Sequence, residues 1–477
     1  MNKHIYKLFA LTLALFLGSC SDFGDMNIDR NNPSTPSTAA LFTSAIRSMP
    51  GQVASSQPLE YVQHLTQKYY TDSSRYGASD FSYNGTYQGP LEDLQEIIKL
   101  NSDAETAEKQ LINGSNENQI AIAKILQSWY FWMMTDAWGD IPYSQALQGR
   151  ANFKPGFDDQ SAVYDGIFAT LKSAASSLDV SGTISGDILF DGDLTMWKKF
   201  ANSIRMVMAL RLSNVDAGKA KAEFAAAMVD GVLNEGENVT YIHLSDENND
   251  NPWEDAFETR RDWTIAKPFM DYMKSVNDPR IPVFADKALN TQTYEGMPYG
   301  LEQDQAGNIT PNSVSFLGES IRQKTTPTYI LVRAQLLFSM AEAAHLGMIG
   351  GGEVAAEDFY KAGIKASWEQ WGVFDQAAYD AFIALPEIQY SAADAVKKIQ
   401  YQKWVALFMN GFEAWAEWRR TGYPTIVPAP VPLNQFGTIP VRYDYPTTER
   451  DLNGPNYEAQ VSKMGGDEQN VPVWWDK

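Results

Sequence analysis

The sequence predicts an all-α protein of stacked, tetratricopeptide-like helical hairpins joined by long irregular loops. Two observations predict the helices: long segments combine wide apolar faces with narrow polar stripes at helical spacing, and a short Gly-rich turn joins two such segments. A third observation predicts the loops. The stretches between helices are long, polar and rich in Asn, Gly and Pro, yet they contain many aromatic residues, which indicates that they are packed.

The clearest helical pattern covers residues 120–138, which are apolar apart from Asp136 and one narrow polar stripe. Residues 328–346 have the same character, and residues 355–371 place large side chains on one face. The Gly-rich turn at 347–352 makes the last two segments a helical hairpin. Further helices are predicted over residues 160–178, 196–214, 219–233 and 391–418, with Gly411 as a break in the last. No clean 34-residue repeat is present, so we predict stacked hairpins and not a regular solenoid.

The N-terminus has the layout of an exported bacterial lipoprotein. Lys3 and Lys7 precede an apolar run over residues 8–17. At ~1.5 Å per residue this run spans about half of a ~30 Å hydrocarbon core, so it is too short for a membrane anchor. Leu17-Gly18-Ser19-Cys20 resembles the lipobox at which lipoprotein precursors are cut and acylated, and Cys20 is the only cysteine. We therefore expect a signal peptide over residues 1–19, lipidated Cys20 with a flexible tether over 20–40, and a single α-helical domain over 41–477.

The distribution of charge indicates where the protein is located and which ligands are unsuitable. Acids at Asp22 and Asp25 resemble the signal that some Gram-negative bacteria use to display lipoproteins on the outer-membrane surface, so we expect the protein to face the cell exterior. Loss of Lys3 and Lys7 with the signal peptide takes the formal charge from −21 to −23. Nucleic acid is therefore an unsuitable ligand, because phosphate binding relies on concentrated Lys and Arg.

Three stretches carry a family resemblance. They are WMMTDAWGDIPYSQA at residues 132–146, EAWAEWRRTGYP at 413–424, and the C-terminal segment from Tyr445-Pro446 through Gly465-Gly466-Asp467 to Trp474-Trp475. Together they resemble the SusD/RagB superfamily of nutrient-binding outer-membrane lipoproteins, specifically its SusD-like branch. The resemblance implies a single SusD-like domain with tetratricopeptide-like hairpins and a ligand site in irregular loops. It also implies a partner, a SusC-like TonB-dependent transporter that the lipoprotein covers like a lid and supplies with glycans or peptides.

Aromatic residues in loops are the candidate ligand contacts, because sugar faces and peptide side chains both pack on aromatic rings. The candidates are Tyr76, Tyr83 and Tyr87 in the first long loop, Trp253 and Trp263 with Arg260 and Arg261 in or beside an acidic loop, and Tyr294 and Tyr299 in a third loop. Each of these residues has packing in the protein interior as its alternative role.

The acidic loop offers a weak calcium candidate. Asp246, Asn248 and Asp250 have the first three spacings of a calcium-binding loop, but Asn251 stands at the glycine position and Phe257 at the position of the bidentate glutamate. The alternative is a solvated acidic loop, and the sequence predicts no other cofactor.

The sequence predicts capture without chemistry, so we expect no enzyme. Glu413 and Glu417 lie one turn apart on a helix and cannot face each other across a cleft as glycosidase carboxylates do. Two alternatives stay open: a helical-repeat adhesion or assembly lipoprotein, and a surface hydrolase whose facing acids the sequence does not reveal. A glycan is the first ligand to expect and a peptide the second. The mature charge of −23 disfavours polyanionic glycans, although Arg260 and Arg261 form a local basic patch.

Overall fold

The computed structural model describes residues 36–77 and 79–476 of the chain. The expected signal peptide and Cys20 lie outside the described residues. Helix α2 (Thr38–Arg47) begins inside the segment expected to be tether. Within the described ranges, no helix is both long and apolar enough to cross a membrane.

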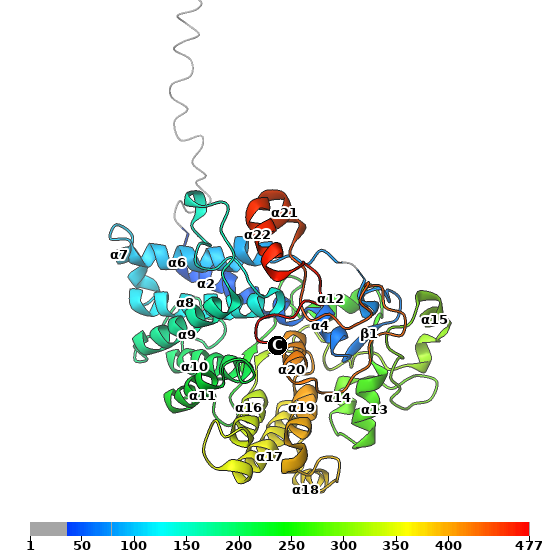
Figure 1. Cartoon of the computed structure of the whole chain (residues 1–477). Helices are drawn as coiled ribbons and strands as arrows, with labels where there is room; N and C mark the ends of the chain where they lie inside the picture. Colours follow the sequence, from blue (N-terminus) through cyan, green and yellow to red (C-terminus); the bar gives the residue numbers. More distant parts are fainter. Residues whose placement is uncertain (1–35, 78, 477) are drawn as a thin grey trace, which may run out of the picture.

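Helices of the first half stack side by side, as the series from cyan to green in Figure 1 shows. The series contains α6 (Glu92–Ser102), α8 (Asn116–Trp138), α9 (Gln160–Ser177), α10 (Leu194–Arg211) and α11 (Ala217–Asp230). Helix α8 packs on both α6 and α9, and α10 packs on both α9 and α11. Helix α8 is buried on most of its circumference, which confirms the prediction from its apolar sequence.

The second half continues the stack. Helices α16 (Arg333–His345) and α17 (Gly352–Gln370) form the predicted hairpin, and α16 also packs against α10 and α19 (Ala395–Ala406). Helices α16 and α17 approach each other closely at Gly363 of α17. A Cβ atom added there would lie 2.8 Å from the ring of Phe338 on α16, so the contact requires glycine.

Two predicted helices differ from the structure. Residues Thr328–Leu331 do not begin a helix but form strand β4, which pairs antiparallel with β2 (Val239–Tyr241). Their apolar, β-branched and aromatic residues suit either element, and a distant partner strand decides between them. The helix expected over 391–418 is two helices, since the chain turns between α19 and α20 (Gly411–Thr421).

The break expected at Gly411 comes directly before it, and Gly411 is the first residue of α20. A Cβ atom at this position would lie 2.7 Å from the backbone nitrogen of Leu59 in α4 (Ser56–Tyr61). Glycine is therefore required where α20 meets α4.

Two short strands on the other side of α4 form a second sheet. Strand β1 (Leu65–Gln67) pairs antiparallel with β3 (Trp263–Ile265). The remaining α-helices are α3 (Met49–Val53), α5 (Asn84–Thr86), α7 (Ala107–Gln110), α12 (Pro252–Glu258), α13 (Lys267–Ser275), α14 (Ile281–Phe284), α15 (Gln303–Asn308), α18 (Gln376–Ile383), α21 (Thr447–Leu452) and α22 (Gly454–Met464). These short elements and their connections carry the long loops that the sequence predicts.

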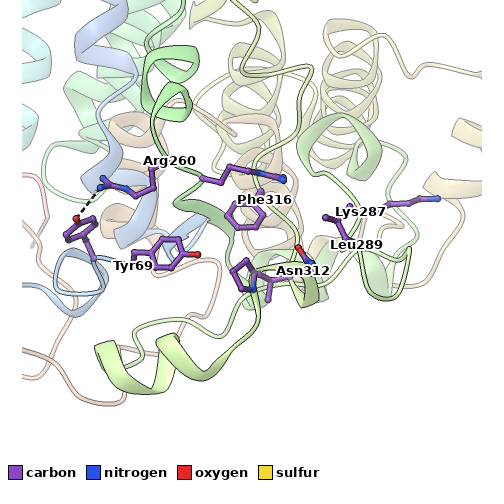
Figure 2. A pocket seen from close by; sticks show the side chains of 10 residues that line it. Tyr69, Arg260, Lys287, Leu289, Asn312 and Phe316 are labelled. Atoms are coloured by element: carbon purple, nitrogen blue, oxygen red, sulfur yellow. Dashed lines mark hydrogen bonds between the residues drawn. The ribbon is translucent and has the colours of Figure 1, made fainter.

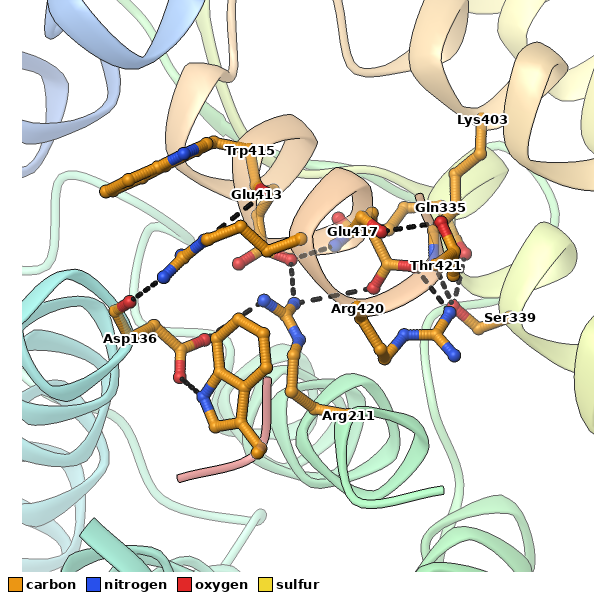
Figure 3. A network of polar contacts seen from close by, with 12 residues as sticks. Asp136, Arg211, Gln335, Ser339, Lys403, Glu413, Trp415, Glu417, Arg420 and Thr421 are labelled. Atoms are coloured by element: carbon orange, nitrogen blue, oxygen red, sulfur yellow. Dashed lines mark hydrogen bonds and ion pairs between the residues drawn. The ribbon is translucent and has the colours of Figure 1, made fainter. Parts of the chain in front are cut away.

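A network of buried charges lies where α8, α10, α16, α19 and α20 meet (Figure 3). Arg211 on α10 bridges two helices, with its Nη1 atom 3.0 Å from Asp136 Oδ2 on α8 and its Nη2 atom 2.9 Å from Glu413 Oε2 on α20. All three side chains are almost fully buried. Each charge is therefore neutralised only by residues from other segments of the chain.

Glu417 on α20 continues the network. Its Oε2 atom lies 3.0 Å from Lys403 Nζ on α19 and 2.7 Å from Arg420 Nη2, the pair that helical spacing allows. Arg420 also binds Glu342 on α16, with Nη1 and Oε1 2.7 Å apart. Burial by itself would raise the pKa of Glu417, but Arg420, Lys403 and Arg211 together hold that pKa below its usual range. The charged form of Glu417 is thus stabilised in the core.

A buried carboxyl group fixes the turn that follows β1. Glu60 of α4 is fully buried, and its Oε1 atom accepts hydrogen bonds from the hydroxyls of Ser73 and Ser74. Burial raises the pKa of Glu60 to about 8. The group is therefore mainly protonated at neutral pH and holds the turn without a buried charge.

We expect Arg211→Met to destabilise the protein by about 3–5 kcal/mol, because it leaves two buried carboxylates without their shared counterion. Arg450→Met is the matched control, since Arg450 on α21 is exposed and its partner Asp451 is exposed as well. The control should change stability by about 0.5 kcal/mol or less. Urea unfolding of the two variants measures this difference, and equal midpoints would contradict the assignment.

We expect the stability difference between the wild type and Glu60→Gln to depend on pH. The pKa of Glu60 in the folded protein, about 8, lies above its ordinary value of 4.5, so folding requires a proton between these limits. As pH rises from 4.5 to 8, the wild type should lose about 1.4 kcal/mol per pH unit relative to the variant, which cannot ionise.

Urea unfolding at pH 5.5 and 7.5 measures this change. The exposed Glu105→Gln should show a nearly constant difference from the wild type. A constant difference for Glu60→Gln as well would show that the carboxyl group ionises in the folded protein.

Candidate functional site

A cavity of about 580 Å³ lies among the loops, next to the β1–β3 sheet (Figure 2). Aromatic, basic and small polar side chains from three segments share its walls. The lining residues are Tyr69, Tyr70, Arg260, Arg261, Lys287, Leu289, Pro311, Asn312, Val314 and Phe316.

The register of the β1–β3 sheet brings the aromatic and basic residues together. Leu65 pairs with Ile265 and Gln67 with Trp263, and the ladder continues where Lys68 N donates to Asp262 O at 2.9 Å. Extension of this antiparallel register by two residues places Tyr69 opposite Arg261 and Tyr70 opposite Arg260. The first wall of the cavity is thus the frayed end of a two-stranded sheet.

Contacts in the structure follow this register. The guanidinium carbon of Arg260 lies 4.4 Å from the centre of the Tyr70 ring, and Arg260 Nη1 donates to the Tyr70 hydroxyl at 3.1 Å. The Asp262 carboxylate accepts from the backbone nitrogen of Tyr69 at 2.8 Å. Cation–π and hydrogen-bond contacts therefore hold both strand ends in place.

A second wall comes from the segment between α14 and β4. Arg261 stacks on Phe316, with its guanidinium carbon 4.5 Å from the ring centre. Leu289 is 57% exposed and Tyr70 56% exposed. Leu289 lies near Asn312 and Lys287, whose amide and ammonium groups can direct hydrogen bonds to a bound molecule (Figure 2).

The structure places the predicted site residues in two groups. Arg260 and Arg261 line the cavity, whereas none of the seven predicted aromatic residues does. Four of the seven rings are buried: Tyr76, Tyr83, Trp253 and Tyr299. The other three are half-buried: Tyr87, Trp263 and Tyr294.

Packing and hydrogen bonds account for the buried rings. The Tyr76 hydroxyl accepts from Ala429 N at 2.9 Å, and the Tyr83 hydroxyl donates to Glu449 at 2.9 Å. Trp253 and Trp263 meet edge to face with ring centres 5.6 Å apart. Tyr76 and Tyr83 thus join distant segments of the chain, and the two tryptophans pack on each other. This is the packing role that the sequence analysis left open.

Sequence reasoning missed Tyr69, Tyr70 and Lys287. The two tyrosines come directly before the predicted loop, so a search restricted to loops passes over them. A strand prediction over Leu65–Gln67 would have identified them as residues at a sheet end, but three residues are too few for a periodic signal.

A lysine from a distant segment of the chain lies among the carboxylates of the acidic loop. Lys324 Nζ lies 3.2 Å from Asp250 Oδ2 and 4.0 Å from Glu254 Oε2, and it also pairs with Glu247. Of the calcium candidates, Asp246 accepts a hydrogen bond from the Asn249 amide at 2.6 Å. Lys324 thus gives the acidic loop one positive charge from a distant segment, beside Asp250. The carboxylates of Asp250, Glu254 and Asp255 lie close enough together to share a metal ion, so the calcium candidate stays a prediction.

The cavity lacks the groups that glycoside hydrolysis uses. None of its lining residues is Asp or Glu, so the described walls hold no pair of carboxylates for acid–base work. Glu413 and Glu417 lie in the buried ion network instead. The geometry suits binding by aromatic contact, hydrogen bonds and charge.

Comparisons with known proteins match this architecture. Residues 30–446 match the SusD-like_2 family, described as starch-binding associating with outer membrane. A chitin-binding protein of known structure is 27% identical with a TM-score of 0.81, covering 92% of this chain and 100% of its own. A comparison with curated protein sequences found no match.

Two further solved structures have the same fold. A SusD homologue from Bacteroides fragilis is 24% identical with a TM-score of 0.78, covering 93% of this chain and 100% of its own. A chitin-binding SusD homologue from Flavobacterium johnsoniae is 24% identical with a TM-score of 0.75, covering 92% of this chain and 98% of its own. These matches confirm the predicted tetratricopeptide-like helical fold. Because the family match covers most of the sequence, the chain belongs to the SusD-like family of starch-binding proteins that associate with the outer membrane.

Proposed function

We propose that this protein is a surface-exposed outer-membrane lipoprotein that captures a nutrient glycan and passes it to a SusC-like TonB-dependent transporter. The observation that carries the proposal is the cavity beside the β1–β3 sheet, where exposed tyrosine rings lie next to hydrogen-bond donors (Figure 2). Membership of the SusD-like family supports it, as do the chitin-binding proteins that share the fold.

The walls of the cavity suit an oligosaccharide. Sugar rings have apolar faces that pack on aromatic side chains, while their hydroxyls require polar partners around the rim. Tyr69 and Tyr70 supply the rings, and Asn312 supplies an amide that can donate and accept. The volume of about 580 Å³ is that of an ordinary small-molecule site.

The walls of the cavity are preorganised for ligand binding. Glu60 fixes the turn beyond Tyr70, and the stacking of Arg260 on Tyr70 fixes the side chains themselves. Walls that are already ordered lose little conformational entropy on binding, so more of the interaction energy contributes to affinity.

Lipidation of Cys20 would attach the protein to the outer membrane. Two or more acyl chains give stable anchoring, which a single chain does not. Delivery would then depend on the transporter, which supplies the energy for import.

Tyr70→Ala tests the site, and Phe153→Ala is its control. Phe153 is a 77% exposed aromatic residue that lines a different cavity, between α5 and the loop before α9. We expect Tyr70→Ala to weaken binding of the preferred oligosaccharide about 5- to 10-fold, because roughly 1 kcal/mol of ring contact is lost. Phe153→Ala should change affinity by less than about twofold.

Calorimetric titration of the chain from Ser21, with starch, chitin and uronate oligosaccharides, measures both variants. Loss of affinity in Phe153→Ala alone would place the site in the other cavity. Absence of binding to every oligosaccharide by the wild type would contradict glycan capture.

A further inference from the structure

We propose that the cavity selects acidic glycans, in which carboxylate or sulfate groups bind Arg260, Arg261 and Lys287 while the sugar rings pack on Tyr69 and Tyr70. This inference rests on the proposed function, since it names the class of glycan that the same cavity takes.

The charge of the lining is the first observation. Three of the ten lining residues are basic and none is acidic, in a chain whose formal charge is −21. Three other cavities of 310–460 Å³ each contain carboxylates, namely Asp250 in one, Glu92 and Glu449 in the second, and Asp140 in the third. Two of these cavities also contain basic residues, Arg47 in the first and Arg442 with Lys463 in the third. Of these four cavities, the one beside the β1–β3 sheet alone combines three basic residues with no acidic one.

Lys287 is the most available of the three cations. Its side chain is exposed, and its nearest aromatic contact places Nζ 5.8 Å from the centre of the Tyr294 ring. Among the described residues, no carboxylate lies within the 4 Å of an ion pair with Lys287 Nζ. An anionic group of a ligand would meet an ammonium without displacing another partner.

The two arginines are only partly neutralised. Arg261 Nη2 lies 3.3 Å from Asp286 Oδ2, but the same oxygen lies 2.8 Å from Arg322 Nη2. One carboxylate thus serves two guanidinium groups and leaves an excess of positive charge. The Oδ1 atom of Asp286 accepts from Glu319 N at 3.0 Å, which holds this carboxylate in place.

Arg260 has a similarly weak partner, since its Nε atom lies 3.7 Å from Asp262 Oδ2. The guanidinium carbons of Arg260 and Arg261 lie 4.4 Å and 4.5 Å from the centres of the Tyr70 and Phe316 rings. A guanidinium group has five N–H donors; Arg260 uses Nη1 for the Tyr70 hydroxyl, and Arg261 uses Nη2 for Asp286. Their other N–H groups can bind a carboxylate or sulfate through two parallel hydrogen bonds.

The negative charge of the whole chain does not prevent this selection. At physiological ionic strength, exposed charges are largely screened beyond about 8 Å, so distant carboxylates contribute little at the cavity. The excess of cations within the cavity decides the local potential. The sequence analysis left this possibility open, because Arg260 and Arg261 form a local basic patch in an acidic chain.

The test compares acidic oligosaccharides with neutral forms of the same backbones. Oligogalacturonate and oligomannuronate are paired with their carboxyl-reduced forms, and carrageenan oligosaccharides with their desulfated forms. Starch and chitin oligosaccharides complete the panel. Titration calorimetry on the chain from Ser21 measures the wild type, Lys287→Gln, Arg261→Gln and the control Lys172→Gln, whose lysine is exposed on α9.

We expect at least one acidic oligosaccharide to bind at least tenfold more tightly than its neutral form. Lys287→Gln and Arg261→Gln should each weaken that binding about 5- to 10-fold, as the loss of a charge-assisted hydrogen bond predicts. Lys172→Gln should change it by less than twofold. The uronate and sulfate arms show which oxyanion the site prefers.

Three outcomes would overturn the inference. Equal or tighter binding of neutral forms would refute selection for acidic glycans while leaving glycan capture intact. Acid-selective binding that both Lys287→Gln and Arg261→Gln leave unchanged would place the anion contacts elsewhere. Absence of binding to all members of the panel would refute the proposed function together with the inference.

Discussion

The buried ion pairs around Arg211 and Glu417 constrain the rest of the structure (Figure 3). They join five helices that come from both halves of the chain, and a partner missing from any position would leave a buried charge unpaired at a cost of several kcal/mol. The helices can therefore meet in only one arrangement. Helix α20 also packs against α4 through Gly411, and α4 leads directly into β1. The cavity is thus attached to the most constrained part of the core.

The β1–β3 pairing positions the residues that line one wall of the candidate cavity. An antiparallel register fixes which residues lie opposite each other, so the position of Leu65 against Ile265 determines that Tyr70 meets Arg260. Behind the strands, the buried Glu60 accepts hydrogen bonds from the hydroxyls of Ser73 and Ser74, and burial raises its pKa to about 8. Irregular loops can present ligand contacts reproducibly because each end of the strand pair is bound to the scaffold.

Hydrophobic periodicity and turn residues were enough to predict the helical scaffold. They did not identify the residues that line the candidate cavity. The apolar circumference of α8 and the glycine turn between α16 and α17 identified these helices within a few residues. Strand β4 was missed because its identity depends on β2, far away in the sequence. The same limit applies to Tyr69 and Tyr70, whose position opposite the arginines exists only after β1 and β3 pair.

Loop composition alone does not show whether an aromatic side chain lies at the surface or in the interior. Tyr83 and Trp253 lie in long polar segments, but a large protein with irregular loops must cover its core with them, and bulky rings do this most effectively. Arg260 and Arg261 were identified because two consecutive arginines stand out beside an acidic loop. Lys403 and Arg211 looked like ordinary residues of helices and gave no signal of their buried partners.

Hydrogen–deuterium exchange with and without the most tightly bound oligosaccharide tests the central claim most directly. If ligand binds in a cavity that a rigid scaffold holds ready, protection should increase over residues 67–72, 259–263, 286–290 and 311–317, while α8 and α10 stay unchanged. Protection confined to residues 84–92 and 142–155 would place the ligand in the neighbouring cavity and contradict the account. Protection spread through the helices would show that binding reorganises the scaffold, and this would also contradict the claim of a rigid, preformed cavity.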